Sequence, residues 1–544
     1  MPSILCPSSA LARFGRDCSR RRSHRAPFFG LTRRISVNQE AGGDGEALRG
    51  SDSADAENAP AKSPTGPRQV TRAPSPCVNR CGCSSGQVPA THVPNHQRAG
   101  VTARSTPAAQ GLALSHNPES IYVTGGARLE GRVTLDGSKN GSLPLLAATL
   151  LMDGTCTIEN VPLIEDVRTM IDLLCALGLD ARLDDNGVVR VASTGSLKSE
   201  APLDLVHKMR ASFWVAGPLL ARLRRAEVPL PGGCDLGSRP VNFHLQAFER
   251  LGATIAVEHG YMKASADRLV AGTIYQDPRV RSMGATMNTI MAASLADGAT
   301  MIHNASCEPE VVDLCRFINA MGGRIQGAGT TTVTVEGVAA LRGCGFRASC
   351  DRIEAGTLLL AGAITGGDVT VGALDAEQLQ CFLDTLGEAG VEIHISGDDI
   401  RVVCPQRPRA VDIVTGPHPS FHTDLQPQTV AFLCLAKGTS VVQETIYDGR
   451  LTFVDELRRM GAQVKVVDQT AIITGVERLT SAVVQAQNIR AGAALLLAGL
   501  AAEGVTEVVG RHHIDRGYAN LEGKLAALGA TIEANNDRRR ACSG

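Results

Sequence analysis

A short phrase that recurs six times constrains what this chain of 544 residues can fold into. In each copy a segment with helical periodicity is followed by a glycine and then by a short alternating segment, as in RLGATIAV and AMGGRIQG. Successive glycines are 68 to 74 residues apart, at Gly178, Gly252, Gly322, Gly390, Gly461 and Gly529. Six copies at a fixed period are an internal repeat, so the chain is built from six similar units.

Each copy predicts a helix, a left-handed turn and a strand. Apolar residues of the first copy recur at the i, i+3, i+4 and i+7 spacing of an amphipathic helix: Val167, Met170, Ile171, Leu174 and Leu177. The glycine predicts a left-handed helix C-cap, and residues 254–257 alternate as a strand. A second phrase, a helix and then a turn such as Asp153-Gly154 or Asp297-Gly298, recurs out of phase. Two helices and several strands per unit predict an α/β fold, with six units divided into two domains of three.

The distribution of charge excludes one class of function. The formal net charge of -1 combines +8 in residues 1–117 with -9 in residues 118–544. An acidic body and only 3% aromatic residues argue against a nucleic-acid binder with a broad basic, base-stacking surface. No apolar run approaches the 18 or so residues of a membrane-spanning helix, so no span is expected.

The first 117 residues differ from the rest. Residues 1–40 contain eight arginines, several serines and two acidic residues, the composition of an organelle transit peptide. Residues 41–117 are rich in Ser, Pro, Gly and Ala and predict a disordered linker. The plastid is the favoured destination, and the mitochondrion stays open. The alternatives are a regulatory tail or a mistaken gene start on a cytoplasmic protein. Cys77, Cys81 and Cys83 lie in this linker without matching histidines, so no zinc site is expected.

One segment that departs from the repeat carries a cysteine between two turns. Pro231, Gly232 and Gly233 precede Cys234, and Gly237 to Pro240 follow it, which predicts a flexible loop. Arg239 would lower the pKa of the Cys234 thiol and favour the reactive thiolate. The alternative is an ordinary surface loop with an idle thiol.

Other departures point to anion binding. Lys139 and Asn140 lie among glycines and serines just before an apolar helix, where free backbone N–H groups suit an anion, although a plain turn is the alternative. Asp424 stands between turn residues and a helical run and is either a helix N-cap or a general base. His418 and His422 lack an evident third ligand, so no metal is expected. Arginine binds phosphate and carboxylate with two parallel hydrogen bonds, and isolated arginines in short glycine-bearing contexts complete the set: Arg210, Arg352, Arg450, Arg490 and Arg516.

Together these phrases resemble the UDP-N-acetylglucosamine 1-carboxyvinyltransferase family over about residues 118–544. The resemblance rests on PGGCDLGSRPVNFH, DRIEAGT, HTDLQPQ, YDGR and HIDRGY, which occur in this order. It implies a two-domain inside-out α/β barrel with six βαβαββ units. The first domain would span about 139–350, and the second would combine 118–138 with 351–544.

The resemblance also implies an activity: enolpyruvyl transfer from phosphoenolpyruvate to the 3'-hydroxyl of UDP-N-acetylglucosamine by addition and elimination. Cys234 would act as the acid and Asp424 as the base, with Lys139 as a further catalytic residue. No cofactor or metal is implied. Phosphoenolpyruvate would bind to the cations Lys139, Arg239, Arg450, Arg490 and Arg516. The UDP-sugar would contact Asn140, Arg210, Pro240, Val241, Asn242, Ser282, Met283, Gly284, Asp424 and Ile446.

Several positions depart from the family pattern. Cys307 stands in place of a common arginine, His422 in place of a customary proline, and Asn242 in place of a frequent aspartate, and the stretch QDPRVRSMGAT is about two residues longer. Two alternatives therefore stay open. One is the sibling 3-phosphoshikimate 1-carboxyvinyltransferase, which lacks the PGGC loop, and the other is an inactive binding or scaffold relative.

Overall fold

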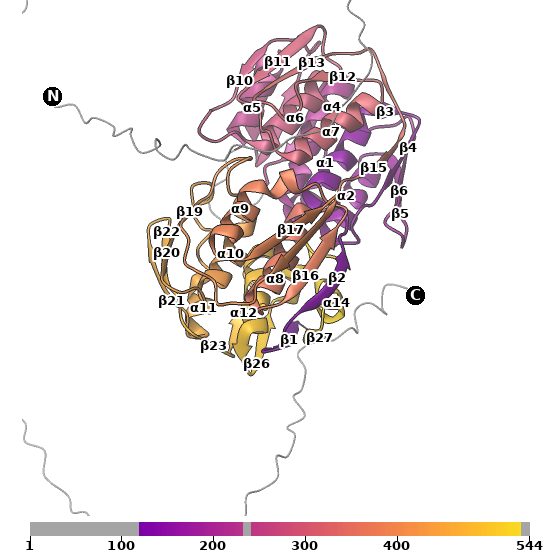
Figure 1. Ribbon diagram of the computed structural model, residues 1–544. Coiled ribbons are helices and arrows are strands. Elements are labelled where there is room, and N and C mark those ends of the chain that lie inside the picture. Colours follow the sequence, from indigo (N-terminus) through magenta and orange to yellow (C-terminus); the bar gives the residue numbers. More distant parts are fainter. Residues whose placement is uncertain (1–118, 232–240, 535–544) are drawn as a thin grey trace, which may run out of the picture. The chain divides into compact units, whose positions relative to one another are not determined.

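The structure is a computed structural model that describes residues 119–231 and 241–534 (Figure 1). The leader predicted in residues 1–117 lies outside the described residues, and so do Cys234, Arg239 and Pro240. Among the residues described, every helix is too short or too polar to cross a bilayer.

Six outer helices end at the repeat glycines. Each glycine has a φ between 89° and 106°, a region that is nearly strain-free only for glycine. The predicted left-handed caps are therefore confirmed. The first of these helices buries the predicted stripe of Val167, Met170, Ile171 and Leu174. The six are α2 (Glu165–Ala176), α5 (Asn242–Arg250), α7 (Pro309–Ala320), α9 (Gln380–Glu388), α11 (Val454–Arg459) and α14 (Leu521–Ala527).

Six inner helices alternate with the outer ones along the described chain, and five of them precede the second recurring phrase. They are apolar on all sides, which is why most of their residues are buried, and every residue of α8 and α10 is. Their small residues allow close packing, as at Gly356, whose missing side chain leaves room for Leu425. The six are α1 (Lys139–Ala148), α4 (Ala216–Leu223), α6 (Met283–Ala293), α8 (Arg352–Ile364), α10 (Gln426–Leu433) and α12 (Ile489–Ala501).

Six small sheets of three or four strands surround the inner helices, one for each copy of the repeat. The first three have the orders β15 (Gly345–Arg347), β4 (Thr155–Glu159), β6 (Val189–Ser193), β5 (Leu179–Leu183); β7 (Arg225–Pro229), β9 (Tyr261–Ser265), β8 (Thr254–Glu258); and β10 (Thr273–Tyr275), β11 (Ala299–His303), β13 (Thr332–Glu336), β12 (Arg324–Gln326). The others are β2 (Glu130–Thr134), β16 (Asp368–Gly372), β18 (Asp399–Val403), β17 (Glu392–Ser396); β19 (Ile413–Val414), β20 (Thr439–Gln443), β22 (Thr470–Thr474), β21 (Gln463–Val467); and β24 (Val483–Gln485), β26 (Val505–Val509), β1 (Ser120–Thr124), β27 (Thr531–Ala534).

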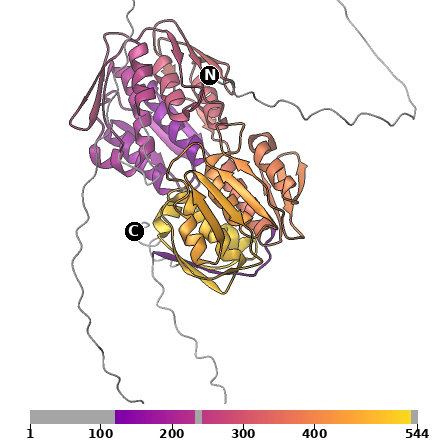
Figure 2. The ribbon, with the colours of Figure 1, turned by 90° about the vertical axis from the view of Figure 1, so that its left-hand side faces the viewer.

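The first two strands pair with the C-terminal part of the chain. β1 is antiparallel to β26 and β27, and β2 is parallel to β16. Both views show these indigo strands beside orange and yellow elements (Figures 1 and 2). The buried apolar residues form two clusters. We call residues from Leu143 to Ala348 the first core, and residues from Ile121 to Leu135 with Ile353 to Ala530 the second core.

Candidate functional site

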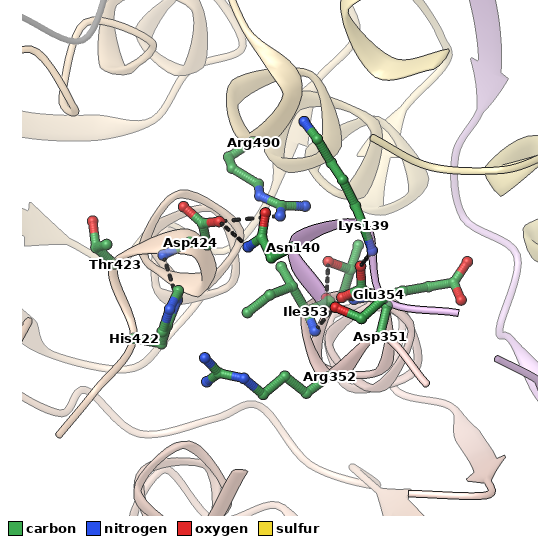
Figure 3. Close-up of polar contacts among 12 residues, drawn as sticks. Lys139, Asn140, Asp351, Arg352, Ile353, Glu354, His422, Thr423, Asp424 and Arg490 are labelled. Carbon is green, nitrogen blue, oxygen red and sulfur yellow. Dashed lines mark hydrogen bonds and ion pairs between the residues drawn. The ribbon is translucent and has the colours of Figure 1, made fainter. Parts of the chain in front are cut away.

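The predicted site residues gather at the N-terminal ends of the inner helices. Lys139 and Asn140 are the first two residues of α1, and Arg490 is the second residue of α12. Asp424 lies in the short helix η4 (Thr423–Leu425), which runs into α10. These three elements bring their side chains together between the two cores, as Figure 3 shows for Asn140, Asp424 and Arg490.

Asp424 is the centre of this group because three side chains bind its carboxylate. Arg450 Nη2 lies 2.6 Å from Oδ1, and Arg490 Nη2 lies 3.1 Å from Oδ2. Asn140 of the first core donates from Nδ2 to Oδ2 at 3.5 Å. Both arginines are almost wholly buried, at 2% and 5% side-chain exposure. The paired, desolvated charges therefore lie within the second core, and the uncharged Asn140 amide links the carboxylate to α1 of the first core.

Electrostatics hold Asp424 in its ionised form. Burial alone would raise its pKa, but Arg490, Arg450 and His422 outweigh burial and set the pKa well below its usual range. The stabilisation from the ionised form is present above the ordinary carboxyl pKa and is lost only as the pH falls through the lowered value. At neutral pH this group is a carboxylate, which is the form that a base requires.

A second ion cluster joins Lys139 and Arg516 through a residue that the sequence did not single out. Asp166 Oδ2 lies 2.8 Å from Lys139 Nζ, and its Oδ1 lies 2.9 Å from Nε of Arg516, the C-cap of α13 (Arg511–Asp515). Burial lowers the pKa of Lys139, Asp166 opposes this effect, and Arg490 and Arg516 add to it. Asp166 is an acidic residue in the first turn of α2, where such residues are common, so its place in the sequence does not indicate a second role.

The remaining predicted contacts lie in two places. Arg210 begins η2 (Arg210–Val215). Burial, and then the charge of Arg210, lower the pKa of His244 in α5 to about 3. Gly284 packs against Trp214 and His244. Val241 and Asn242 begin α5, and Ser282 and Met283 begin α6. Ile446 lies apart from these residues, near Asp424. Its N–H donates to Glu444, which also accepts from the hydroxyl of Thr423, the residue before Asp424.

Two interpretations from the sequence are wrong. The first turn of α1 was expected to offer free N–H groups, but Lys139 N donates to Asp351 Oδ2 at 3.1 Å and Gly141 N donates to Ser138 Oγ at 3.0 Å. Helix capping by carboxylate and hydroxyl oxygens satisfies these donors before any ligand binds. The N-cap alternative for Asp424 also fails, because His422 is the N-cap of η4.

Arg352 forms a buried clamp between the cores. Its Nη2 donates to Glu308 at 2.6 Å, and Nε and Nη2 each donate to Glu310 at 3.0 Å. The arginine begins α8 of the second core, whereas both glutamates precede or begin α7 of the first. All three side chains are less than 10% exposed. A buried arginine with two carboxylates satisfies its donors in the geometry that guanidinium prefers.

Comparison with known proteins first gives the class. Residues 123–525 match the family model described as EPSP synthase (3-phosphoshikimate 1-carboxyvinyltransferase). The solved enolpyruvyl transferase NikO from Streptomyces tendae superposes with a TM-score of 0.70 at 24% identity, over 76% of this chain and 98% of that one. EPSP synthase from Acinetobacter baumannii gives a TM-score of 0.58 at 17% identity, over 76% and 99%. The fold is therefore the enolpyruvyl transferase fold, as predicted.

Curated relatives then give the family. UDP-N-acetylglucosamine 1-carboxyvinyltransferase from Desulfosudis oleivorans is 46% identical over 76% of this chain and 99% of its own length. The second such enzyme of Symbiobacterium thermophilum is 50% identical over 76% and 97%. The chain belongs to the UDP-N-acetylglucosamine 1-carboxyvinyltransferase family, and it is a transferase.

The clamp predicts that Arg352→Met lowers the free energy of unfolding by about 3–5 kcal/mol, because two buried carboxylates would lose their counter-ion. Arg401→Met is the matched control. Arg401 pairs with Asp368 at 47% and 31% exposure, and its loss should cost only about 0–1 kcal/mol. Urea unfolding of both variants measures the difference. Equal losses would contradict the interpretation, and adding Glu308→Gln and Glu310→Gln to Arg352→Met should restore part of the stability.

Proposed function

We propose that this protein transfers the enolpyruvyl group of phosphoenolpyruvate to the 3'-hydroxyl of UDP-N-acetylglucosamine and releases phosphate, the first committed step of peptidoglycan precursor synthesis. The observation that carries the proposal is the ionised Asp424, which lies between arginines of the second core and Asn140 of the first. Family membership supports this acceptor over shikimate 3-phosphate, because the relatives that share 44–50% of their residues with this chain bear the UDP-N-acetylglucosamine name.

In the proposed reaction Asp424 removes the proton of the sugar 3'-hydroxyl, and the 3'-oxygen of the sugar attacks C2 of phosphoenolpyruvate. C3 receives a proton from Cys234, which gives a tetrahedral ketal. C3 then loses a proton and the bond between C2 and the phosphate oxygen breaks. These changes release phosphate and restore the enol double bond. Lys139 lies near enough to Arg490 and Arg516 to share the charge of the leaving phosphate.

Substrate binding would also prepare the base. In the free protein Arg450 and Arg490 hold the pKa of Asp424 far below neutral, which makes it a weak base. The phosphate and carboxylate of phosphoenolpyruvate would compete with Asp424 for both arginines. They would likewise compete with Asp166 for Lys139 and Arg516. Loss of these partners raises the pKa of a buried carboxylate. We propose that anion binding converts Asp424 from an ion-pair partner into the base.

We propose binding roles for the predicted residues in two sets. Phosphoenolpyruvate would contact Lys139, Arg239, Arg450, Arg490 and Arg516. The UDP-sugar would contact Asn140, Arg210, Asp424, Ile446, residues 240–242 and residues 282–284. The proposed domains are 139–350 and 118–138 with 351–544, limits that the separation of the two cores supports.

Phosphate release from phosphoenolpyruvate and UDP-N-acetylglucosamine by the purified full-length chain tests the function. Asp424→Asn should lower kcat by about 10²–10⁴-fold, since general base catalysis contributes about that much. Asp455→Asn is the control, because Asp455 is a 74% exposed carboxylate that pairs with Arg458, and its activity should be unchanged. No release by the unmodified chain would sink the proposal, and release with shikimate 3-phosphate alone would favour the sibling activity.

The lowered pKa proposed for the Cys234 thiol would leave a fraction of it as thiolate, which predicts covalent labelling by the epoxide fosfomycin. Its sulfur would open the epoxide ring, forming an S–C bond while the C–O bond breaks and the oxygen takes a proton. Mass spectrometry should find the adduct on the Cys234 peptide and not on Cys175, an exposed free thiol that serves as internal control. An active enzyme with an unlabelled Cys234 peptide would refute the reactive thiolate.

We propose that residues 1–117 direct the protein to an organelle, the plastid in preference to the mitochondrion. Eight arginines against two acidic residues in the first 40 positions support this reading. A fluorescent reporter fused to residues 1–117 should accumulate in plastids, and replacing the eight arginines with glutamine should abolish import. Uniform cytosolic fluorescence of the unmodified fusion would dispose of the transit hypothesis and favour the cytoplasm.

A further inference from the structure

His422 lies between Asp424 and a glutamate of the first core. The imidazole is the side-chain N-cap of η4, where Nδ1 accepts the backbone N–H of Asp424 at 3.0 Å. Its Nε2 lies 3.8 Å from Glu308 Oε2. The side chain is 15% exposed, and Figure 3 shows it below Asp424 with its ring directed toward the Asp424 backbone. This one ring therefore contacts both the backbone of the proposed base and the opposite core.

Glu308 fixes the loop that carries His422. Its Oε1 accepts the backbone N–H of His418 at 3.1 Å, and its Oε2 accepts from Arg352 at 2.6 Å. Glu308 stands immediately before α7 of the first core, and the loop 418–422 belongs to the second. The position of Asp424 is consequently tied to the first core by two routes: its own carboxylate through Asn140, and its backbone through His422.

The hydrogen bond from Asp424 assigns the tautomer of the ring. Because Nδ1 accepts a hydrogen bond, the neutral ring carries its hydrogen on Nε2, facing Glu308. A protonated imidazole has a donor on each nitrogen, so its Nδ1–H would point at the Asp424 N–H. The N-cap is thus available only from the neutral ring.

We propose that His422 is a positioning residue for Asp424, whose N-terminal cap on η4 holds the base in place only while the imidazole is neutral and so makes catalysis sensitive to acid. The inference rests on the proposed role of Asp424 as base. It assigns the acid-side loss in kcat/KM, which reports the free enzyme, to the backbone of the base, because in the free enzyme Arg450 and Arg490 keep its carboxylate ionised.

The charges around His422 agree with a neutral ring at neutral pH. Four charged residues face the ring: Arg352 of α8, Glu308 immediately before α7, Glu310 of α7 and Asp424 of η4. Burial and then Arg352 lower its pKa, against the opposing effect of the three carboxylates. Since the folded protein prefers the neutral ring, the cap is intact above the ordinary imidazole pKa and is lost as the pH falls through the lowered value.

Two substitutions at one position test the proposal. His422→Asn keeps an acceptor at the N-cap but cannot be protonated, whereas His422→Ala removes the acceptor. At neutral pH the Asn variant should retain kcat within about twofold, and the Ala variant should lose about fivefold, the value of a typical N-cap. In a series from pH 7.5 down to about pH 4, which reaches below the ordinary imidazole pKa of about 6.5, the Asn variant should keep a larger fraction of its neutral-pH activity than the unmodified enzyme.

Asp375 supplies the matched control. This exposed residue caps η3 (Ala376–Leu379) by accepting the Glu377 N–H at 3.0 Å, so Asp375→Ala removes an equivalent cap elsewhere. It should leave kcat and its pH profile unchanged. An Asn variant with the same acid-side loss as the unmodified enzyme, or an Ala variant with unchanged kcat, would overturn the proposal.

A readout without substrate separates this inference from the proposed function. The NMR shift of the Asp424 backbone amide should change between about pH 7.5 and pH 4, a span that reaches below the ordinary imidazole pKa of about 6.5, and should stay constant in His422→Asn. A constant shift in the unmodified protein would overturn the positioning role. Absence of phosphate release with the amide titrating as expected would instead refute the proposed function alone.

Discussion

The burial of the six inner helices decides where every polar group of the site can lie. These helices are apolar around most of their circumference, so strongly polar side chains are accommodated chiefly at their ends. α1, α8 and α12 of the two cores carry Lys139, Arg352 and Arg490 at their N-terminal ends. The site is therefore built where helices begin, and loops adjust its details. A repeat that fixes the packing of one helix fixes the approximate place of six.

Charge is concentrated where the cores meet. Residues 118–544 carry a formal net charge of -9, yet Asp424 and Asp166 each bind two cations at this place. Buried charges need partners, and in the free molecule carboxylates of the protein supply them. An anionic ligand can take over the same cations, and the carboxylates that it displaces lose their partners. The ion pairs thus keep the unliganded site stable and define which bonds a phosphate or carboxylate has to replace.

The sequence predicted what depends on local order. Helix ends at Gly178 and the other repeat glycines followed from apolar spacing and from the backbone freedom of glycine, and the α/β class followed from their alternation. Asp166 was missed, because nothing near it in the chain indicates that it binds Arg516, which stands 350 residues away. The bonded N–H of Lys139 was mispredicted for the same reason, since Asp351 belongs to a distant segment, whereas the Ser138 cap of Gly141 is local. Pairings between the cores are properties of the assembled fold.

The departures at Cys307 and His422 become related once the fold is known, because both lie beside Glu308. The Cys307 thiol has its pKa raised by burial, so at neutral pH it is uncharged at the position where the family resemblance implies an arginine. The imidazole of His422 lies 3.8 Å from Glu308 on the other side. Arg352 then provides the permanent charge at Glu308, and His422 adds one that depends on pH. With a thiol at position 307 and an imidazole at position 422, the proposed role of His422 would make the contact between the cores titratable, while both carboxylates that bind Arg352 remain.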